Sequence, residues 1–96
     1  MNQRRVKFKE WNCITEYTSY AVDSKLIRIL LRDIEDLTPI AVATSYIEGL
    51  KEGEVAVKNY SENQGMLQAL VEYDIVEKPH RMINEFPICY IKTIPQ

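Results

Sequence analysis

The chain has 96 residues, of which 46% are hydrophobic and 27% are charged, and its formal net charge is −2. This length and composition predict one globular domain over residues 1–96 and argue against intrinsic disorder. No apolar run approaches the roughly 20 residues of a membrane span, and the basic start of the chain leads into no apolar signal segment. We therefore expect a cytoplasmic protein with no membrane partner.

Antiparallel strands are predicted for the first half of the chain. Residues 11–21 alternate loosely and are rich in Thr and Tyr, which favours a strand, and we expect a bulge or bend near residues 9–10. Residues 26–32 carry apolar side chains on both faces, which is typical of an inner strand. A polar turn that ends at Pro39 leads to a third strand at residues 40–45, so the three strands form a meander.

A strand that leads directly into a helix is the clearest pattern in the second half. Residues 54–57 alternate as a short strand, and Ser61 with Gln64 matches the S-x-x-Q pattern of a capping box. An apolar stripe at helical spacing then predicts a helix over residues 62–73: Met66, Leu67, Leu70 and Val71. Asp74 suits the left-handed conformation that closes a helix.

One more strand completes the predicted fold. Phe86, Ile88 and Tyr90 alternate with a second set of apolar residues, well beyond the break at Pro79. The element order is then β-β-β-β-α-β. We therefore expect an α+β protein, in which an antiparallel sheet of about five strands carries one helix on one face and leaves the other face to solvent or a partner.

Acidic residues are concentrated in the middle of the chain. Residues 33–77 contain ten acids and two bases, a net charge of −8, whereas the remainder contains four acids and ten bases, a net charge of +6. If the fold keeps these segments apart, the molecule has an acidic side that attracts a basic partner. The alternative is that the segments interleave on a solvated surface.

The residue types indicate no catalytic, cofactor or metal site. His80 is the only histidine and lies in a polar stretch, where we expect it to face solvent. Cys13 and Cys89 are expected within strands as small buried residues, with a disulfide or a reactive thiol as the alternatives. The spacings of a structural zinc site, a calcium loop and a phosphate-binding loop are absent from the sequence. We therefore expect no enzyme.

Two further patterns bear on partners. Four basic residues at positions 4–9 accompany aromatic side chains, as in a nucleic-acid-binding arm, but four charges on an acidic protein would bind a polyanion weakly. Lysines on a solvated edge strand explain the same residues, so we do not expect a nucleic-acid partner. Six tyrosines, including Tyr17 and Tyr46, indicate either a partner surface or simple cover for the edges of the core.

The run from Glu54 to Val76 resembles a family of uncharacterised single-domain proteins encoded mostly in phages and conjugative elements of Gram-positive bacteria. The family shares the pattern EVAIKDYSEN-x-G-(L/M)-L-x-AL and a last strand that ends in P-(V/I)-C. Here Pro87-Ile-Cys89 fits that ending, and the stretch 39–43 is similar in outline, while Asp74 stands where the family pattern has glycine. The resemblance implies an accessory protein of a mobile genetic element, and it carries over no catalytic residue.

We therefore expect a non-enzymatic protein that binds a host or element-encoded protein through an acidic surface, for example as an inhibitor of a defence protein. The candidate contact residues are Asp33, Glu35, Asp36, Tyr17 and Tyr46. Two alternatives stay open. The first is a self-associating domain that pairs as a homodimer through an edge strand or an exposed sheet face. The second is a small-ligand binder or enzyme with a pocket between helix and sheet, or, less favoured by the charge, a nucleic-acid binder.

Overall fold

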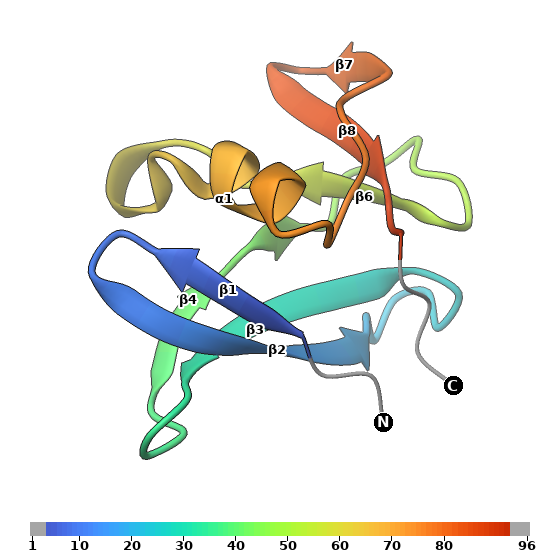
Figure 1. Ribbon diagram of the computed structural model, residues 1–96. Helices are drawn as coiled ribbons and strands as arrows, with labels where there is room; N and C mark the ends of the chain where they lie inside the picture. The colour runs from blue at the N-terminus through green and yellow to red at the C-terminus, as the bar shows by residue number, and fades with distance from the viewer. Residues whose placement is uncertain (1–3, 93–96) are drawn as a thin grey trace.

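A computed structural model of the protein describes residues 4–92. It places them in two four-stranded antiparallel sheets with one α-helix and one 3₁₀ turn (Figure 1). The N-terminal sheet has the order β1 (Arg5–Phe8), β2 (Trp11–Ser19), β3 (Ile27–Asp33) and β4 (Pro39–Val42). The C-terminal sheet has the order β5 (Thr44–Ser45), β6 (Glu54–Val57), β8 (Phe86–Tyr90) and β7 (Arg81–Ile83). The α+β class and the antiparallel pairing are confirmed, but the expectation of one sheet with about five strands is wrong.

Ala43 is the corner at which the chain leaves one sheet and enters the other. Its N–H donates to the Ile29 carbonyl in β3 at 2.8 Å, and its carbonyl accepts from the Lys58 N–H, directly after β6, at 2.9 Å. The Ala43 side chain is fully buried at this corner. The strand expected at residues 40–45 is therefore two short strands in different sheets, which is why the expectation of one sheet failed.

The N-terminal sheet is a meander of consecutive strands, as its sequence predicts. Phe8 of β1 pairs with Trp11 of β2, so residues 9 and 10 form a tight turn with Lys9 at φ 56°. The bulge or bend expected there is thus a hairpin turn. It explains why Val6 and Phe8, which are 1% and 2% exposed, both point into the core.

The β7–β8 hairpin ends the C-terminal sheet. Ile83 pairs with Phe86, so Asn84 and Glu85 form a two-residue turn with φ of 47° and 72°. Positive φ at both central residues is typical of a type I′ turn, whose twist matches that of the strands. β7 is the outer strand of the sheet and was not predicted, because it has only three residues.

The helix α1 (Met66–Glu72) begins later than expected. Residues Ser61–Asn63 form a 3₁₀ turn (η1), in which Ser61 has a φ of 54° and makes no side-chain cap bond. The predicted capping box is therefore wrong. Asn59 supplies the cap instead, since its Oδ1 accepts from the Leu67 N–H at 2.8 Å.

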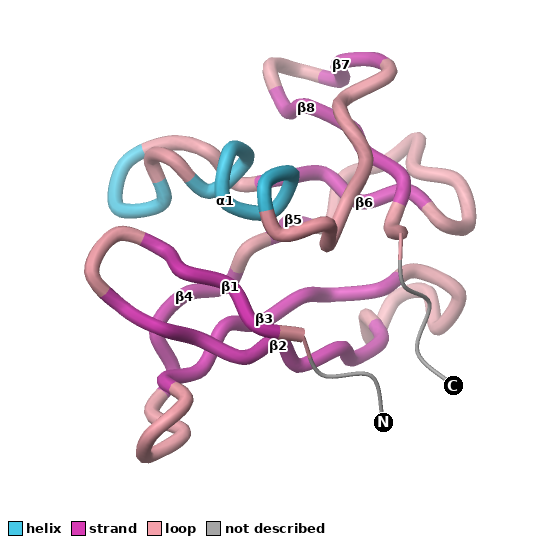
Figure 2. The backbone as a smooth tube through the Cα atoms, in the orientation of Figure 1, coloured by secondary structure: helices cyan, strands magenta, loops and turns pink. Residues whose placement is uncertain are grey.

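The end of α1 and its apolar stripe agree with the prediction. Asp74 has a φ of 61°, and the Ile75 N–H then donates to the Leu70 carbonyl at 2.8 Å. Met66 and Leu70 are fully buried in the core that lies between the two sheets. Figure 2 shows α1 over β1, on the inner side of the N-terminal sheet.

The inner faces of both sheets carry the core residues. Val55 and Val57 of β6 point into the core, as predicted. In the part of the chain that the structure describes, no helix covers the outer face of the N-terminal sheet (Figures 1 and 2). Within residues 4–92, no helix has the length and apolar character needed to cross a membrane.

Candidate functional site: a groove under the β7–β8 hairpin

A groove of about 610 Å³ lies between the β7–β8 hairpin and the segment that leads into α1. Most of the side chains that line it are apolar: Val57, Tyr60, Leu67, Pro79, Met82, Phe86 and Pro87. Asn59, Asn84 and Glu85 supply the polar part of the lining. The seven-residue helix α1 contributes Leu67 to this lining.

Large apolar side chains at this groove face solvent. Met82 is 60% exposed and Tyr60 is 53% exposed. The rings of Tyr60 and Phe86 meet edge to face with centroids 6.0 Å apart, a favourable arrangement for an aromatic pair. The groove therefore has an aromatic pair in its lining and an accessible methionine.

The turn at the rim of the groove keeps a strained residue. Glu85 holds a φ of 72°, where a side chain other than Gly or Asn costs about 1 kcal/mol. Glycine is the residue that this turn position favours. The chain thus has a carboxylate at the groove rim in spite of a small loss of stability.

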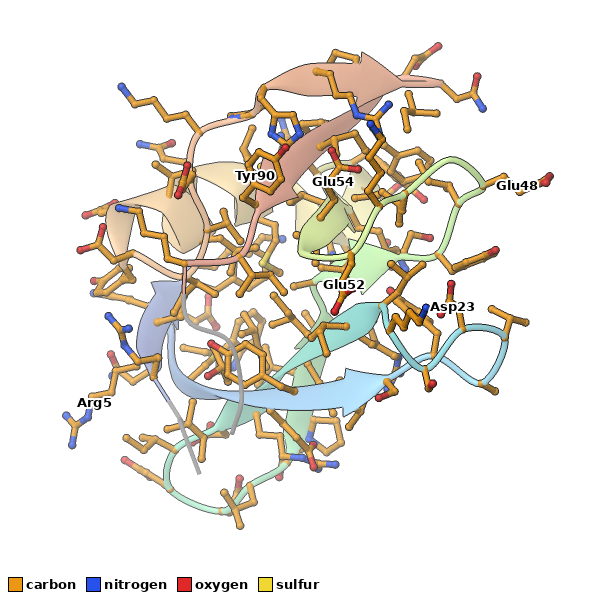
Figure 3. All side chains as sticks on the ribbon, turned by 90° about the vertical axis from the view of Figure 1, so that its right-hand side faces the viewer. Arg5, Asp23, Glu48, Glu52, Glu54 and Tyr90 are labelled. Atoms are coloured by element: carbon orange, nitrogen blue, oxygen red, sulfur yellow. The ribbon has the colours of Figure 1, made fainter. Side chains whose placement is uncertain are left out.

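A buried carboxylate holds the base of the hairpin in place. Glu54 of β6 is 2% exposed, and its Oε1 accepts from the Lys51 N–H at 2.9 Å and from Arg81 Nη2 at 2.7 Å. Its Oε2 accepts from Arg81 Nε at 3.1 Å and lies 2.6 Å from His80 Nε2. Figure 3 shows Glu54 and Tyr90 side by side on this face of the molecule.

Aromatic stacking and a loop contact complete this cluster. The His80 ring stacks on the Tyr90 ring with centroids 4.0 Å apart and an angle of 11° between the planes. Arg81 Nη2 also donates to the Gly49 carbonyl at 2.8 Å. We call Glu54, His80, Arg81 and Tyr90 the hairpin clamp, since they tie the start of β7 to β6 and β8.

The charge state of Glu54 follows from these contacts. Hydrogen bonds from Arg81 lower the pKa of Glu54 to about 2 against the opposing effect of burial, and His80 and the Lys51 N–H add to the lowering. The same carboxylate raises the pKa of Arg81. Glu54 is therefore ionised at neutral pH, so His80 Nε2 carries a hydrogen and donates it. A carboxylate with this pKa accepts a proton poorly and serves to position the hairpin.

The hairpin clamp includes a contact and a residue that the sequence did not reveal. His80 is an exposed residue, as expected, but its side chain is 28% exposed and contacts the buried Glu54. The signal for Glu54 was ambiguous, because an acid at the start of a short strand usually faces solvent. The pairing of Glu54 with Tyr90 in the C-terminal sheet brings Glu54 close to His80, which is 26 positions away in the chain.

The acidic residues singled out from the sequence lie in the turn between β3 and β4, far from the groove. Asp33 Oδ1 accepts from the Glu35 N–H at 2.8 Å, and Asp36 Oδ1 accepts from the Thr38 N–H at 3.0 Å. The Thr38 contacts lower the pKa of Asp36. Leu37 in the same turn is 53% exposed, with a φ of 64°.

The acidic segment 33–77 does not form one surface. In Figure 1 the turn between β3 and β4 projects at the bottom of the molecule, and α1 lies at the upper left. In Figure 3, Glu48 points outward from the loop between β5 and β6, on a further side. The acidic side chains are thus distributed around the protein.

The two tyrosines proposed for partner contact have different surroundings. Tyr17 packs against the core, and its hydroxyl is enclosed without a hydrogen-bond partner. Tyr46 is 40% exposed and stacks on Tyr20 with centroids 5.7 Å apart. Of the two, Tyr46 is the one that a partner can reach.

The aromatic residues of the basic N-terminal segment are not stacking platforms. Phe8 is buried in the core, and Trp11 packs against it. Lys9 Nζ donates to the Glu62 carbonyl at 2.6 Å, so this cation connects β1 to η1.

Both cysteines are buried, free thiols, as expected for small core residues. Burial, and to a smaller extent the charge of Asp33, raises the pKa of Cys13. Burial raises the pKa of Cys89 to about 11. Both thiols are therefore protonated at neutral pH and poor nucleophiles.

Comparison of the chain with protein-family models, with curated proteins and with solved structures gives no match. The link to phages and conjugative elements thus stays a prediction from the central run of the sequence. Among residues 4–92, no group of three or more His, Cys, Asp or Glu side chains is placed to hold a metal ion.

Proposed function

We propose that this protein is a non-enzymatic binding protein whose groove holds an apolar side chain of a partner protein. The observation that carries the proposal is the exposure of Met82 and Tyr60 beside a concave apolar lining. Exposed apolar surface of this kind marks interaction sites, since it otherwise lowers solubility. Aromatic residues and methionine are also enriched at the centres of protein interfaces.

Charge favours a basic partner. Glu85 supplies a carboxylate at the groove rim, next to the amide side chains of Asn59 and Asn84. The acids of segment 33–77 lie on several sides of the molecule (Figures 1 and 3) and attract cationic groups within about one Debye length, roughly 10 Å at 0.1 M salt. The partner segment that suits this groove best has an apolar side chain for the groove and a neighbouring lysine or arginine for the Glu85 carboxylate.

The resemblance to proteins of phages and conjugative elements supports a biological setting for this binding. In that setting the protein is an accessory factor of a mobile element, and its partner is a host or element-encoded protein, including a defence protein that it inhibits. The nucleic-acid site of a defence nuclease is positively charged, and a positive charge complements the Glu85 carboxylate at the rim of the groove.

Capture experiments with matched variants test the groove. Met82→Glu places a charge in the groove, whereas Val22→Glu makes the same change at a 71% exposed site in the loop between β2 and β3. A partner that the wild type and Val22→Glu retain, identified by mass spectrometry, should be lost from Met82→Glu. Equal retention by all three proteins would exclude the groove as the binding site.

A small ligand in the same groove is the alternative, because its volume falls in the usual range of ligand sites, about 300–1,000 Å³. Ligand-induced shifts in melting temperature distinguish the two functions. A compound that stabilises the wild type and Val22→Glu but not Met82→Glu would favour the ligand.

A further inference from the structure

The outer face of the N-terminal sheet is partly apolar, and no helix of the described residues covers it (Figure 1). Side chains alternate along each strand, and the residues that face the core are Val6, Phe8, Cys13, Thr15, Ile29 and Leu31. The residues between them therefore point outward. Ile14, Leu30 and Val42 form an apolar strip across β2, β3 and β4, in which Leu30 is 8% exposed and Ile14 and Val42 are half-buried. Leu30 pairs with Val42 and lies two positions from Arg32, the partner of Ile14.

This outer face is basic, although the whole molecule is acidic. Arg5 and Lys7 of β1 and Arg28 of β3 point outward, and none of the three has an ion pair among the described residues. Arg32 is paired with Glu16, from Nε to Oε1 at 2.7 Å. The face thus has three cations that are available for an acidic group.

The acidic group lies at the end of the same sheet. The turn between β3 and β4 projects beyond the sheet, on the side away from α1 (Figure 1). It presents the carboxylate of Glu35 and the exposed side chain of Leu37. Arg32 Nη1 donates to the Leu37 carbonyl at 3.0 Å and the Leu37 N–H donates to the Asp33 carbonyl at 2.9 Å, so the turn is held rigidly.

These features are self-complementary. Arg28 lies near the start of β3, and the acidic turn directly follows its end. Two copies related by a two-fold axis that lies just outside this face, opposite the middle of β3 and perpendicular to the strand, bring each acidic turn to the Arg28 end of the other copy, with the apolar strips facing one another. We infer that a second copy of this chain covers the outer face of the N-terminal sheet and forms a two-fold dimer.

The size of the face predicts a weak dimer. The four strands have 4, 9, 7 and 4 residues, and at about 3.3 Å per residue and 4.8 Å per strand they cover a face of roughly 380 Å². The total area buried by the two sheets is then about 760 Å², well below the range of stable specific interfaces, roughly 1,200–2,000 Å². We therefore expect association that is reversible on dilution and weakened by salt.

The dimer would leave the proposed binding function intact. The groove lies on the side of α1 and the β7–β8 hairpin, away from the outer face of the N-terminal sheet (Figure 1). Both grooves of the dimer stay accessible, so the assembly is bivalent towards a partner.

Charge reversal followed by sedimentation velocity over a dilution series tests the dimer. The variants are Arg28→Glu and Glu35→Arg, and the control is Glu48→Arg, which lies in the loop between β5 and β6 (Figure 3). We expect Arg28→Glu and Glu35→Arg each to weaken dimerisation by more than about tenfold, because like charges then meet. An equimolar mixture of the two should form a heterodimer, and Glu48→Arg should associate like the wild type.

Three results would overturn the inference: a wild type that stays monomeric at the highest concentration, single variants that dimerise like the wild type, or growth beyond the dimer. Circular dichroism of each variant shows whether it is folded. Met82→Glu should dimerise normally, whereas Arg28→Glu should still bind a partner in the groove. A failure of the dimer is thus distinguishable from a failure of the proposed function.

Discussion

A carboxylate buried in a strand is stable only when its oxygen lone pairs have partners, and four hydrogen bonds supply them to Glu54. Two of the four come from one guanidinium, in the bidentate geometry that arginine favours. Because His80 and Arg81 are consecutive, one carboxylate determines where the hairpin begins. At the scale of single residues, polar contacts thus shape the groove as much as its apolar lining does.

Substitution of Glu54 should change how stability depends on pH. The pKa of Glu54 falls from 4.5 to about 2 on folding, so its contribution is present above pH 4.5 and is lost as the pH falls through 2. The contribution is roughly 3 kcal/mol, since one pKa unit corresponds to about 1.4 kcal/mol. Urea unfolding of Glu54→Gln should show a lower free energy of unfolding at pH 7 and a flatter profile between pH 5 and 2.

The exposed Glu48→Gln is the matched control for this experiment, because it removes the same charge from a site without described hydrogen bonds. It should change the free energy of unfolding by less than about 0.5 kcal/mol. A Glu54→Gln profile parallel to that of the wild type would show that the hairpin clamp does not titrate as described.

The two thiols should be unreactive in the folded protein. Cys13 and Cys89 are 1% and 0% exposed, and burial raises both of their pKa values. An aromatic disulfide reagent should therefore modify them only when the chain unfolds, and in denaturant both should react at the rate of a free thiol. Rapid reaction under native conditions would contradict the described core.

At the scale of elements, two residues could cap the start of α1: Ser61 in a capping box, or Asn59 through its side chain. The sequence places a serine in a good capping pattern, but the structure uses the Asn59 side chain from before η1. Asn59→Ala should lower the free energy of unfolding by about 1 kcal/mol, whereas Ser61→Ala should have little effect. Thermal unfolding of both variants measures the difference, and a larger loss for Ser61→Ala would favour the capping box.

In the β7–β8 turn, one substitution should raise the stability of the protein. Glu85→Gly should stabilise the protein by about 1 kcal/mol, because glycine adopts the positive φ without strain. If the Glu85 carboxylate contacts the partner, the same variant should bind the partner more weakly. An unchanged melting temperature would argue against strain in this turn.

Local patterns in the sequence predicted the elements well and their assembly poorly. The hydrophobic alternation in β2, β3, β6 and β8 and the apolar stripe on α1 follow from which of their side chains are buried. These elements could therefore be predicted from the sequence. The corner at Ala43 depends on hydrogen bonds to both sheets, and no local pattern marks it. The hairpin clamp was missed for the same reason, since its residues come from β6, β7 and β8.

At the scale of the whole molecule, one core joins both sheets and α1, so the chain should unfold in a single transition. Trp11 reports on the N-terminal sheet through its fluorescence, and Cys89 reports on the C-terminal sheet through its accessibility to a thiol reagent. In the Cys13→Ala variant, the two signals should change at the same denaturant concentration. Separate midpoints would mean that the sheets unfold independently.

The corner at Ala43 has a mechanical consequence for recognition. The backbone of a single residue is bonded to both sheets, so the angle between the two layers cannot open without breaking one of these hydrogen bonds. A side chain larger than alanine at position 43 would not fit in this buried corner and would push the two sheets apart. The protein should therefore bind its partners as a rigid body. Any conformational change that a close fit requires should occur in the partner.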